Sequence, residues 1–396
     1  MGASEYGMYA FVLSMAAILA IAAKLGLPTA VLRFVSEYQE DAEWKLLRGI
    51  VQGSWTIALG VGLAVATGAY AVIGGLHRLG YIDQPLPLQV GVWLIPLLSL
   101  ITLQKETVRG LEHMVLAYAP SYIGRRVLVL LSVGAAHAWL GAVDSTMALS
   151  LTAGVLVLIV AGQAVAGWRR LPSPARTASP TYKMQTWFRV AWPLLLVASF
   201  NVVLNQMDIF LLGVLRTSAE VGYYNVALKT GTVVTFLLTG INAIAAPRIA
   251  RMYRNGDMDL LQRLVSMVAH LSFWPSLLGS IVLISISAPF LRLFGAEFDA
   301  AQGALIILVV GKLINAGAGS VGYLMNMTGH QDESARVFAW SAAANVAFNL
   351  ALIPPFGIEG AAVATGSTAA LWNVWLCVLV KRRMGITSHV LTRPWT

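Results

Sequence analysis

Long apolar runs, separated by short polar or charged breaks, follow one another along the whole chain. The hydrocarbon core of a bilayer takes about 20 mostly apolar residues per helical span. Strand-length alternation of apolar and polar residues does not occur, which disfavours a membrane β-barrel. The runs predict an all-α polytopic membrane protein with eleven helices, at about 6–32, 50–75, 89–109, 121–140, 146–167, 187–215, 222–247, 264–290, 300–325, 336–354 and 357–380.

One polar stretch is longer than the other breaks. It reads WRRLPSPARTASPTYKMQ, from Trp168 to Gln185, and its Pro, Ser and Arg content is typical of a linker without a helical pattern. The stretch divides the chain into an N-terminal lobe of five helices (1–167), a cytoplasmic linker (168–186) and a C-terminal lobe of six helices (187–396).

An internal repeat relates the two lobes. The stretch GASEYGMYAFV, which begins at Gly2, is matched by TSAEVGYYNVAL, which begins at Thr217. Each copy precedes an apolar run that leads to a basic break, so both copies face the same way across the membrane. The repeat predicts two pseudo-symmetric helical bundles. At a constant offset of 215, the matched pairs are Glu5 and Glu220, Gly7 and Gly222, Tyr9 and Tyr224, Tyr38 and Tyr253, and Arg48 and Arg263.

Composition and charge agree with the helical pattern. Of 396 residues, 58% are hydrophobic and 11% charged, which is not the composition of a soluble protein. Most Lys and Arg fall in alternate loops, and such loops face the cytoplasm. One of these predicted loops holds Lys105, Arg109, Arg125 and Arg126. The N-terminus is therefore expected outside and the C-terminus in the cytoplasm, and the net charge of +9 reflects topology rather than a nucleic-acid partner.

Several local motifs, spread over nearly the whole chain, resemble one family of transporters. They include MDIFLLGVLRTSAEVGYYNVALK, APRIARMYRNGD, LFGAEFDAAQGALIIL, MNMTGHQDESARV and NVAFNLALIPPFGIEGAAVAT. On these motifs the chain is similar to the oligosaccharide flippases of polysaccharide biosynthesis (Wzx-like), which are related to multidrug and toxin extruders (MATE-like) and to lipid II flippases. Members normally carry one more helix before the stretch like GASEYGMYAFV, so the first family helix is expected to be missing.

The resemblance implies a mechanism and a cargo. Two six-helix bundles would surround a central cavity that opens alternately to the cytoplasm and the exterior of a bacterial or archaeal cell (inner) membrane. The cargo would be a polyprenyl-diphosphate-linked oligosaccharide, used in O-antigen, capsule or exopolysaccharide biosynthesis. A cation-coupled multidrug extruder of the same fold is the alternative, and a membrane glycan polymerase or glycosyltransferase is a further one.

Ionisable residues inside the predicted helices are the first candidates for the cargo pathway, because a charge at the bilayer centre costs several kcal/mol. Lys312 lies about twelve residues into its predicted helix, near the midplane. Lys24, Lys229 and Lys312 are predicted to line the cavity and to attract a diphosphate as point charges. For Lys24 and Lys229 the alternative is snorkelling, with the ammonium group at the lipid headgroups.

Asp208 and several asparagines complete the candidate site. Asp208 is expected at the same depth as Lys229, so it can pair with that lysine, or it can titrate and couple transport to H⁺ or Na⁺. Asn205, Asn225 and Asn315 share helix faces with these charges and are predicted to line the cavity, with helix packing as the alternative. Tyr223 and Tyr224 are expected in the interfacial aromatic belt.

Other chemistry finds no support in the sequence. The single cysteine, Cys377, lies in an apolar run and forms no metal-binding cluster. His330, Asp332 and Glu333 fall together in a loop, where a solvated turn is expected rather than a metal site. Neither a Walker A motif nor a Ser/His/Asp arrangement is present. A transporter without a cofactor is therefore expected rather than an enzyme, with membrane lipids as further partners.

Overall fold

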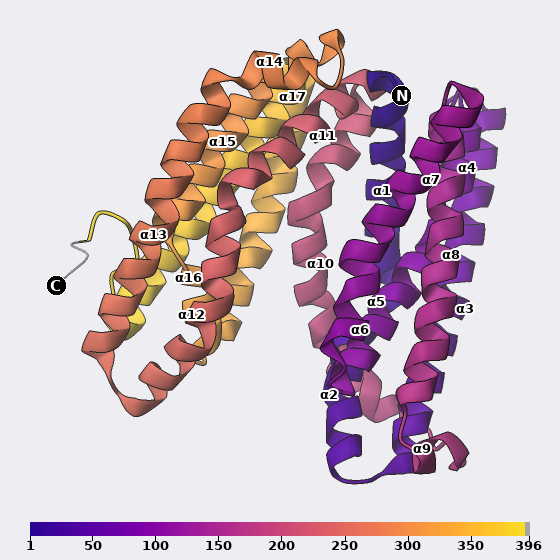
Figure 1. Cartoon of the computed structure of the whole chain (residues 1–396), viewed down its shortest axis with the longest axis vertical. Helices are drawn as coiled ribbons and strands as arrows, with labels where there is room; N and C mark the ends of the chain where they lie inside the picture. The colour runs from indigo at the N-terminus through magenta and orange to yellow at the C-terminus, as the bar shows by residue number, and fades with distance from the viewer. Residues whose placement is uncertain (393–396) are drawn as a thin grey trace. The chain divides into compact units, whose positions relative to one another are not determined.

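A computed structural model describes residues 1–392, apart from the side chains of residues 197, 237 and 243. Helices and turns make up this part of the chain and no strand occurs in it, which confirms the all-α class. Two compact units divide the chain. Unit 1 comprises Met1 and Met8–Val202, and unit 2 comprises Gly2–Gly7 and the chain from Val203 onward. The boundaries lie inside α1 and α10, which are labelled in Figure 1, so each of these helices contributes to both units.

Unit 1 holds the helices from most of α1 to the first part of α10. Pro96 explains one break, because it has no N–H to donate to the carbonyl of Val92, and Ile95 donates to that oxygen instead at 3.1 Å. The elements are α1 (Ala3–Lys24), α2 (Leu27–Glu40), α3 (Trp44–Arg78), α4 (Pro85–Gly91), α5 (Leu94–Gly110), α6 (Met114–Ala119), the π-helix η1 (Pro120–Gly124), α7 (Arg125–Leu140), α8 (Ser145–Arg170), α9 (Ser173–Thr177) and α10 (Met184–Leu215).

Two apolar clusters form the core of unit 1. In one cluster, α2, α3 and α5 pack together with Trp187 of α10, whose indole N–H donates to Tyr38 at 3.1 Å. In the other, α1 packs on α4, α5 and α8 through small residues such as Ala16 and Ala20. Figure 1 shows these helices side by side: α3 packs on α5, α5 on α8, and α8 on α7.

Unit 2 contains the remaining helices, and its core joins α12, α13, α16 and α17. Thr217 and Glu220 form a reciprocal capping box that fixes the start of α11. The elements are α11 (Ser218–Gly231), η2 (Thr232–Thr235), α12 (Phe236–Asn255), α13 (Met258–Ser285), α14 (Ser287–Arg292), η3 (Ala296–Ala301), α15 (Gln302–Ala318), α16 (Val321–Met327) and α17 (Gln331–Met384).

Nine helices in the described part of the chain are long and apolar enough to span a membrane, and a pair bent by 49° after residue 235 would make a tenth. The chain is therefore a multi-pass membrane protein. The predicted number of eleven stays a prediction, because helices 336–354 and 357–380 fall within the single element α17, which is broken at Gly357. The predicted C-terminal lobe also includes residues 393–396, which lie outside the described residues.

Several predicted helix boundaries were wrong. The run 6–32 is divided at Leu25 and Gly26, both with positive φ, into α1 and α2. The run 300–325 is divided at Gly319 into α15 and α16. The linker contains the short helix α9, and α8 continues to Arg170. Backbone turns at Leu25 and Gly319 interrupt the helices without interrupting the apolar pattern, so the sequence pattern did not reveal them.

The two repeat copies contact each other within unit 2. A β-carbon added at Gly7 would overlap the carbonyl oxygen of Ser218, and one added at Gly222 would overlap that of Ala3. The contact is reciprocal, because Ala3 and Gly7 are the counterparts of Ser218 and Gly222 at the offset of 215. Small residues four apart let two helix backbones approach closely. The first turns of α1 and α11 therefore pack backbone to backbone.

This contact predicts a stability effect. Replacing Gly222 with alanine should destabilise the protein by about 1–3 kcal/mol, because the new methyl group must displace the backbone of Ala3. The control is Gly231→Ala on the same helix, where a β-carbon meets Leu308 and Val309 at ordinary distances of 3.7 and 3.9 Å. Thermal unfolding in detergent should show a lower midpoint for Gly222→Ala alone. Equal midpoints would contradict the close approach.

Candidate functional site

A pocket of about 290 Å³ in unit 1 is rich in basic side chains. Lys24, Lys105, Arg125 and Arg126 line it, together with Tyr122. We call it the cationic pocket. Its remaining lining residues are Ala17, Leu98, Ile101, Thr102 and Ser121.

The end of α1 positions Lys24 in the pocket. Lys24 is the last residue of α1, and Leu25 and Gly26 then turn the chain with φ of 47° and 71°. A β-carbon at Gly26 would overlap the carbonyl oxygen of Ala191, so glycine is required both for the turn and for the close approach of α10. Lys24 is half-buried. The turn leaves its ammonium group at the negative end of the α1 dipole.

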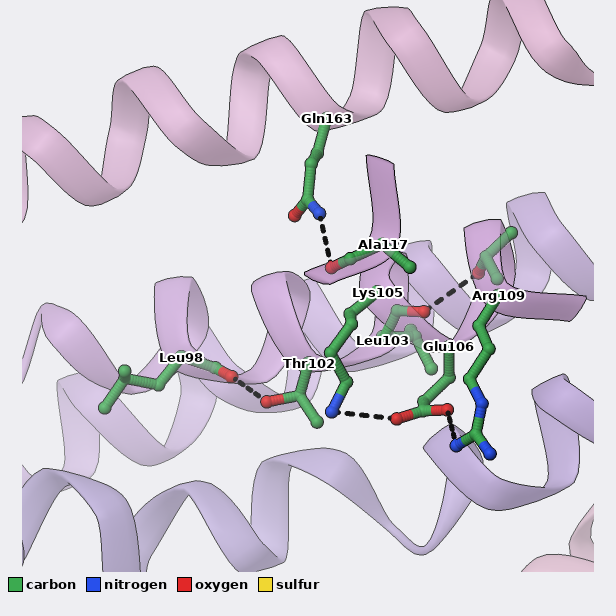
Figure 2. Close-up of polar contacts among 9 residues, drawn as sticks. Leu98, Thr102, Leu103, Lys105, Glu106, Arg109, Ala117 and Gln163 are labelled. Carbon is green, nitrogen blue, oxygen red and sulfur yellow. Dashed lines mark hydrogen bonds and ion pairs between the residues drawn. The ribbon is translucent and has the colours of Figure 1, made fainter. Parts of the chain in front are cut away.

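Lys105 is held by acidic and aromatic partners. Its Nζ lies 2.9 Å from Oε1 of Glu106, and Nη1 of Arg109 lies 3.2 Å from Oε2 of the same carboxylate (Figure 2). The Lys105 ammonium is also 5.9 Å from the ring centroids of Tyr118 and Tyr122, within the range of a cation–π interaction. These contacts fix the ammonium group at the wall of the pocket.

A π-helical turn carries the rest of the pocket. Pro120 has no N–H, so the carbonyl of Leu116 one turn earlier loses its helical partner. Nε2 of Gln163 on α8 donates to that carbonyl at 3.2 Å. The same Nε2 is 3.5 Å from the carbonyl oxygen of Ala117, the contact drawn in Figure 2. The following turn widens into the π-helix η1, and such turns frequently occur at functional sites. Tyr122 lies in this π-helix and Arg125 directly follows it, so the turn supplies both residues to the lining of the cationic pocket.

The pocket has the chemistry of an anion site. Four basic side chains line it, while Glu106 is the carboxylate that neutralises part of this charge. The hydroxyl of Ser121 is buried and has no hydrogen-bond partner in the described part of the chain. A phosphate oxygen could accept from that hydroxyl and from the guanidinium group of Arg125.

Unit 2 contains a second polar site, centred on Asp208 of α10. Asp208 is only 2% exposed. Its Oδ2 accepts hydrogen bonds from the hydroxyls of Tyr224, at 2.5 Å, and Thr365, at 3.0 Å, while Oδ1 accepts from the backbone N–H of Ile209 at 3.1 Å. The hydroxyls come from α11 and α17, so three helices converge on one buried carboxylate. We call these residues the Asp208 cluster.

Tyr224 was expected in the interfacial belt, and the structure corrects this. The side chain is fully buried, because its hydroxyl has a carboxylate partner inside the unit. Tyr223 is half-buried, and its ring packs edge-on against Phe298.

The predicted lysines fall into two groups. Lys24 lies in the cationic pocket of unit 1. In unit 2, half-buried Lys312 on α15 lies within electrostatic reach of Asp208 and of exposed Lys229 on α11. Lys312 therefore lies near both the Asp208 cluster and Lys229, while the Asp208 carboxylate itself accepts hydrogen bonds from hydroxyls.

The predicted asparagines differ in their surroundings. Asn225 is buried, and its Nδ2 donates to the hydroxyl of Tyr6 at 2.9 Å, which ties α11 to the first turns of α1. Asn205 is exposed on α10 and Asn315 half-buried on α15. Their part in a cargo pathway stays a prediction.

Sequence reasoning missed Arg125 and Arg126 as site residues. It placed the start of their helix at about residue 121, so both arginines counted as loop charges. In the structure that span begins at Met114, so Arg125 lies eleven residues inside it. The apolar run MVLAYA before Pro120 was the available signal, since it continues the apolar pattern toward the N-terminus.

Comparisons with known proteins agree on the class of fold. A multidrug resistance MATE family transporter in an inward-facing conformation superposes with a TM-score of 0.78 at 12% identity, covering 97% of this chain and 95% of the other. The lipid II flippase MurJ in an inward closed conformation gives a TM-score of 0.71 at 12% identity, covering 96% and 86%. The chain therefore has a MATE-like fold of two pseudo-symmetric helical bundles.

Sequence comparison then identifies the family. The profile described as "Polysaccharide biosynthesis protein" matches residues 1–253, and the chain belongs to this family. Two relatives from Haloferax volcanii are "Probable flippase AglR", 26% identical over 208 residues, and "Probable low-salt glycan biosynthesis flippase Agl15", 26% identical over 175 residues. The matches cover 51% and 43% of this chain but only 42% and 36% of these relatives' own lengths.

Proposed function

We propose that this protein is a flippase that moves a polyprenyl-diphosphate-linked oligosaccharide from the cytoplasmic to the outer leaflet by alternating access. The cationic pocket is the observation that carries the proposal. A diphosphate is the anionic part of such a cargo, and Lys24, Lys105 and Arg125 offer it point charges and a bidentate donor. The flippase names of the two archaeal relatives support the same proposal.

The orientation belongs to the proposal. The basic loops face the cytoplasm, so the N-terminus of the chain lies outside and the C-terminus inside. The glycan would be one used in O-antigen, capsule or exopolysaccharide biosynthesis, and the membrane would be a bacterial or archaeal cell (inner) membrane. The protein acts on its cargo by moving it, without an enzymatic step.

A cation-coupled multidrug extruder of the same fold is the second candidate, and the MATE fold favours it. The charge of the pocket favours the flippase, because four basic side chains would repel a cationic drug. Membrane glycan polymerases and glycosyltransferases are less well supported, since the described helices are joined by short turns on the side opposite to the basic loops.

We place ion coupling at the Asp208 cluster. A buried carboxylate on one helix that accepts hydrogen bonds from the hydroxyls of two others can bind H⁺ directly or Na⁺ through oxygen ligands. Lys312 would link the ion to the cargo, because its ammonium group interacts with the Asp208 carboxylate and can also attract a passing anion, and Lys229 lies within electrostatic reach of Lys312.

Reconstitution distinguishes the two candidate functions. Proteoliposomes would receive a polyprenyl-diphosphate oligosaccharide with a nitrobenzoxadiazole label in one leaflet, and the fraction of fluorescence protected from reduction by externally added dithionite would be followed over time. In parallel, uptake of a lipophilic cationic dye would be measured. Complementation of a flippase-null strain by the chain gives the same answer in cells. Dye transport without glycan translocation would establish the extruder instead.

Lys312 is expected to be required for translocation. Replacing it with alanine should slow glycan translocation on the order of tenfold or more at unchanged protein level, because a cation near the centre of the helix is lost. The matched control is Lys381→Ala, since Lys381 is an exposed lysine at the end of α17. Full activity of the Lys312 variant in the proteoliposome assay would remove this residue from the pathway.

A further inference from the structure

Two open grooves lie on the surface of unit 1 between α6 and α8. They have volumes of about 520 and 580 Å³, and they share Leu116 and Arg170. We call them the paired grooves. None of their lining residues lines the cationic pocket. The first groove is lined by Leu116, Ala161, Gly162, Val165, Ala166, Arg169 and Arg170, and the second by Glu112, His113, Met114, Val115, Leu116, Ala119, Pro120 and Arg170.

Small residues on α8 create the first groove. Ala161, Gly162 and Ala166 leave a furrow along the helix, and a β-carbon added at Gly162 would meet nothing within 4 Å. Beside the furrow, Val115 is 81% exposed and Val165 53% exposed. In a multi-pass membrane protein, such apolar surface is covered by lipid chains. The furrow is therefore shaped to take a hydrocarbon chain.

Two arginines lie at one end of the grooves, where α8 ends. Arg169 and Arg170 are the last residues of the helix and are exposed. Within residues 1–392 neither has an ion-pair partner, and Glu112 on the far wall of the second groove does not reach Arg170. In the proposed orientation this end of α8 lies among the headgroups of the cytoplasmic leaflet, where paired basic residues bind anionic groups. The position and positive charge of Arg169 and Arg170 are those expected of a site that binds the phosphodiester of a lipid headgroup.

We propose that the paired grooves bind one glycerophospholipid from the leaflet on the side of the basic loops. Arg169 and Arg170 hold its phosphodiester, and one of its two chains lies in each groove. Two grooves that share Leu116 and Arg170 match the two chains of a glycerophospholipid. A polyprenyl lipid has a single chain and would fill only one of them. The site is thus separate from the proposed cargo pocket.

The bound lipid would stabilise the wall of the cationic pocket. Leu116 belongs to both grooves, and its carbonyl is the acceptor that Gln163 satisfies where Pro120 removes the helical hydrogen bond. Pro120, which begins the π-helix, also lines the second groove. A lipid packed against Leu116 and Pro120 would hold α6 on α8 and keep the π-helical turn in place.

Native mass spectrometry of the detergent-purified full chain tests the proposal. The probe is phosphatidylglycerol with two oleoyl chains, titrated beside a polyprenyl phosphate. We expect wild-type protein to retain one phosphatidylglycerol. The double substitution Arg169→Ala with Arg170→Ala should weaken its binding on the order of tenfold. Gly162→Leu should abolish retention by filling the furrow, whereas Gly154→Leu, at another open position on α8, should not.

Three other outcomes would overturn the proposal. Equal retention by the Gly162→Leu and Gly154→Leu variants would show that the furrow holds no chain. Unchanged affinity in the double arginine variant would remove the headgroup contact. Preference for the polyprenyl phosphate would assign the grooves to the tail of the cargo instead. Both leucine substitutions fall at positions with free space, so a folded protein is expected in each case, and its melting temperature verifies this.

Discussion

Replacing Arg125 with glutamine should reduce glycan translocation on the order of 10- to 100-fold, the effect of losing a charge-assisted hydrogen bond to the cargo. Arg125 is half-buried and lines the cationic pocket, so its charge is partly shielded from solvent and acts on an anion in the pocket more strongly than a fully exposed charge. The proteoliposome assay described above measures this effect. A conservative Arg125→Lys variant should recover part of the activity. Lysine restores the positive charge but not the planar guanidinium group, whose N–H donors can bind a phosphate in a bidentate manner.

The control for Arg125 is another arginine that can lose its charge without touching the pocket. Arg251 on α12 is exposed, and Arg251→Gln should translocate the glycan at the wild-type rate. If the Arg125 and Arg251 variants were equally active, the pocket would not bind the diphosphate. If both were equally impaired, the charge would act through topology rather than through the site, and the orientation of each variant in the membrane would show this.

The helical class of the protein could be predicted from the sequence. An apolar run of membrane length predicts a helix by itself, because each span must satisfy its own backbone hydrogen bonds in lipid. The breaks within those runs could not be predicted in the same way. Leu25 has φ of 47°, a conformation that the sequence around it does not favour, and it is followed by Gly26, which the approach of Ala191 requires. Tertiary packing of α10 against this turn therefore determines where α1 ends.

The same distinction applies to the cationic pocket. Lys24 could be predicted because a lysine inside an apolar run stands out. Arg125 was counted with the loop charges, because its depth depends on a helix that starts at Met114 and passes through a π-helical turn. Pro120 removes one helical hydrogen bond within this span, and only the contact from Gln163 on another helix shows how the freed carbonyl of Leu116 is satisfied.

In unit 2 the carboxylate was predictable and its partners were not. Asp208 is one of the few acidic residues inside an apolar run, so it was a candidate from the sequence alone. Tyr224 was assigned to the interface because tyrosines near helix ends usually lie there. Its burial against Asp208 requires α11 to pack on α10, with Thr365 of α17 completing the cluster. These are long-range contacts without a local sequence signal.

Replacing Asp208 with asparagine should abolish the dependence of translocation on an ion gradient. Asparagine has nearly the same shape, but it can neither release a proton nor balance the charge of Na⁺. An ion shifts a transport equilibrium only through its different affinity for the two conformations. With that affinity lost, the ratio of translocation rates with and without an imposed Na⁺ or pH gradient should fall to about 1. Proteoliposomes loaded with defined buffers measure this ratio.

A purely structural role for Asp208 predicts a different pattern. The asparagine amide would meet the hydroxyls of Tyr224 and Thr365, and an unmatched buried donor costs about 1–3 kcal/mol of stability. Thr365→Val serves as the matched variant, because it removes one hydroxyl from the cluster and keeps the carboxylate. If Asp208 couples the ion, both variants should melt at lower temperature, but only Asp208→Asn should lose the gradient dependence. A gradient response in Asp208→Asn equal to that of wild-type protein would rule out coupling at this carboxylate.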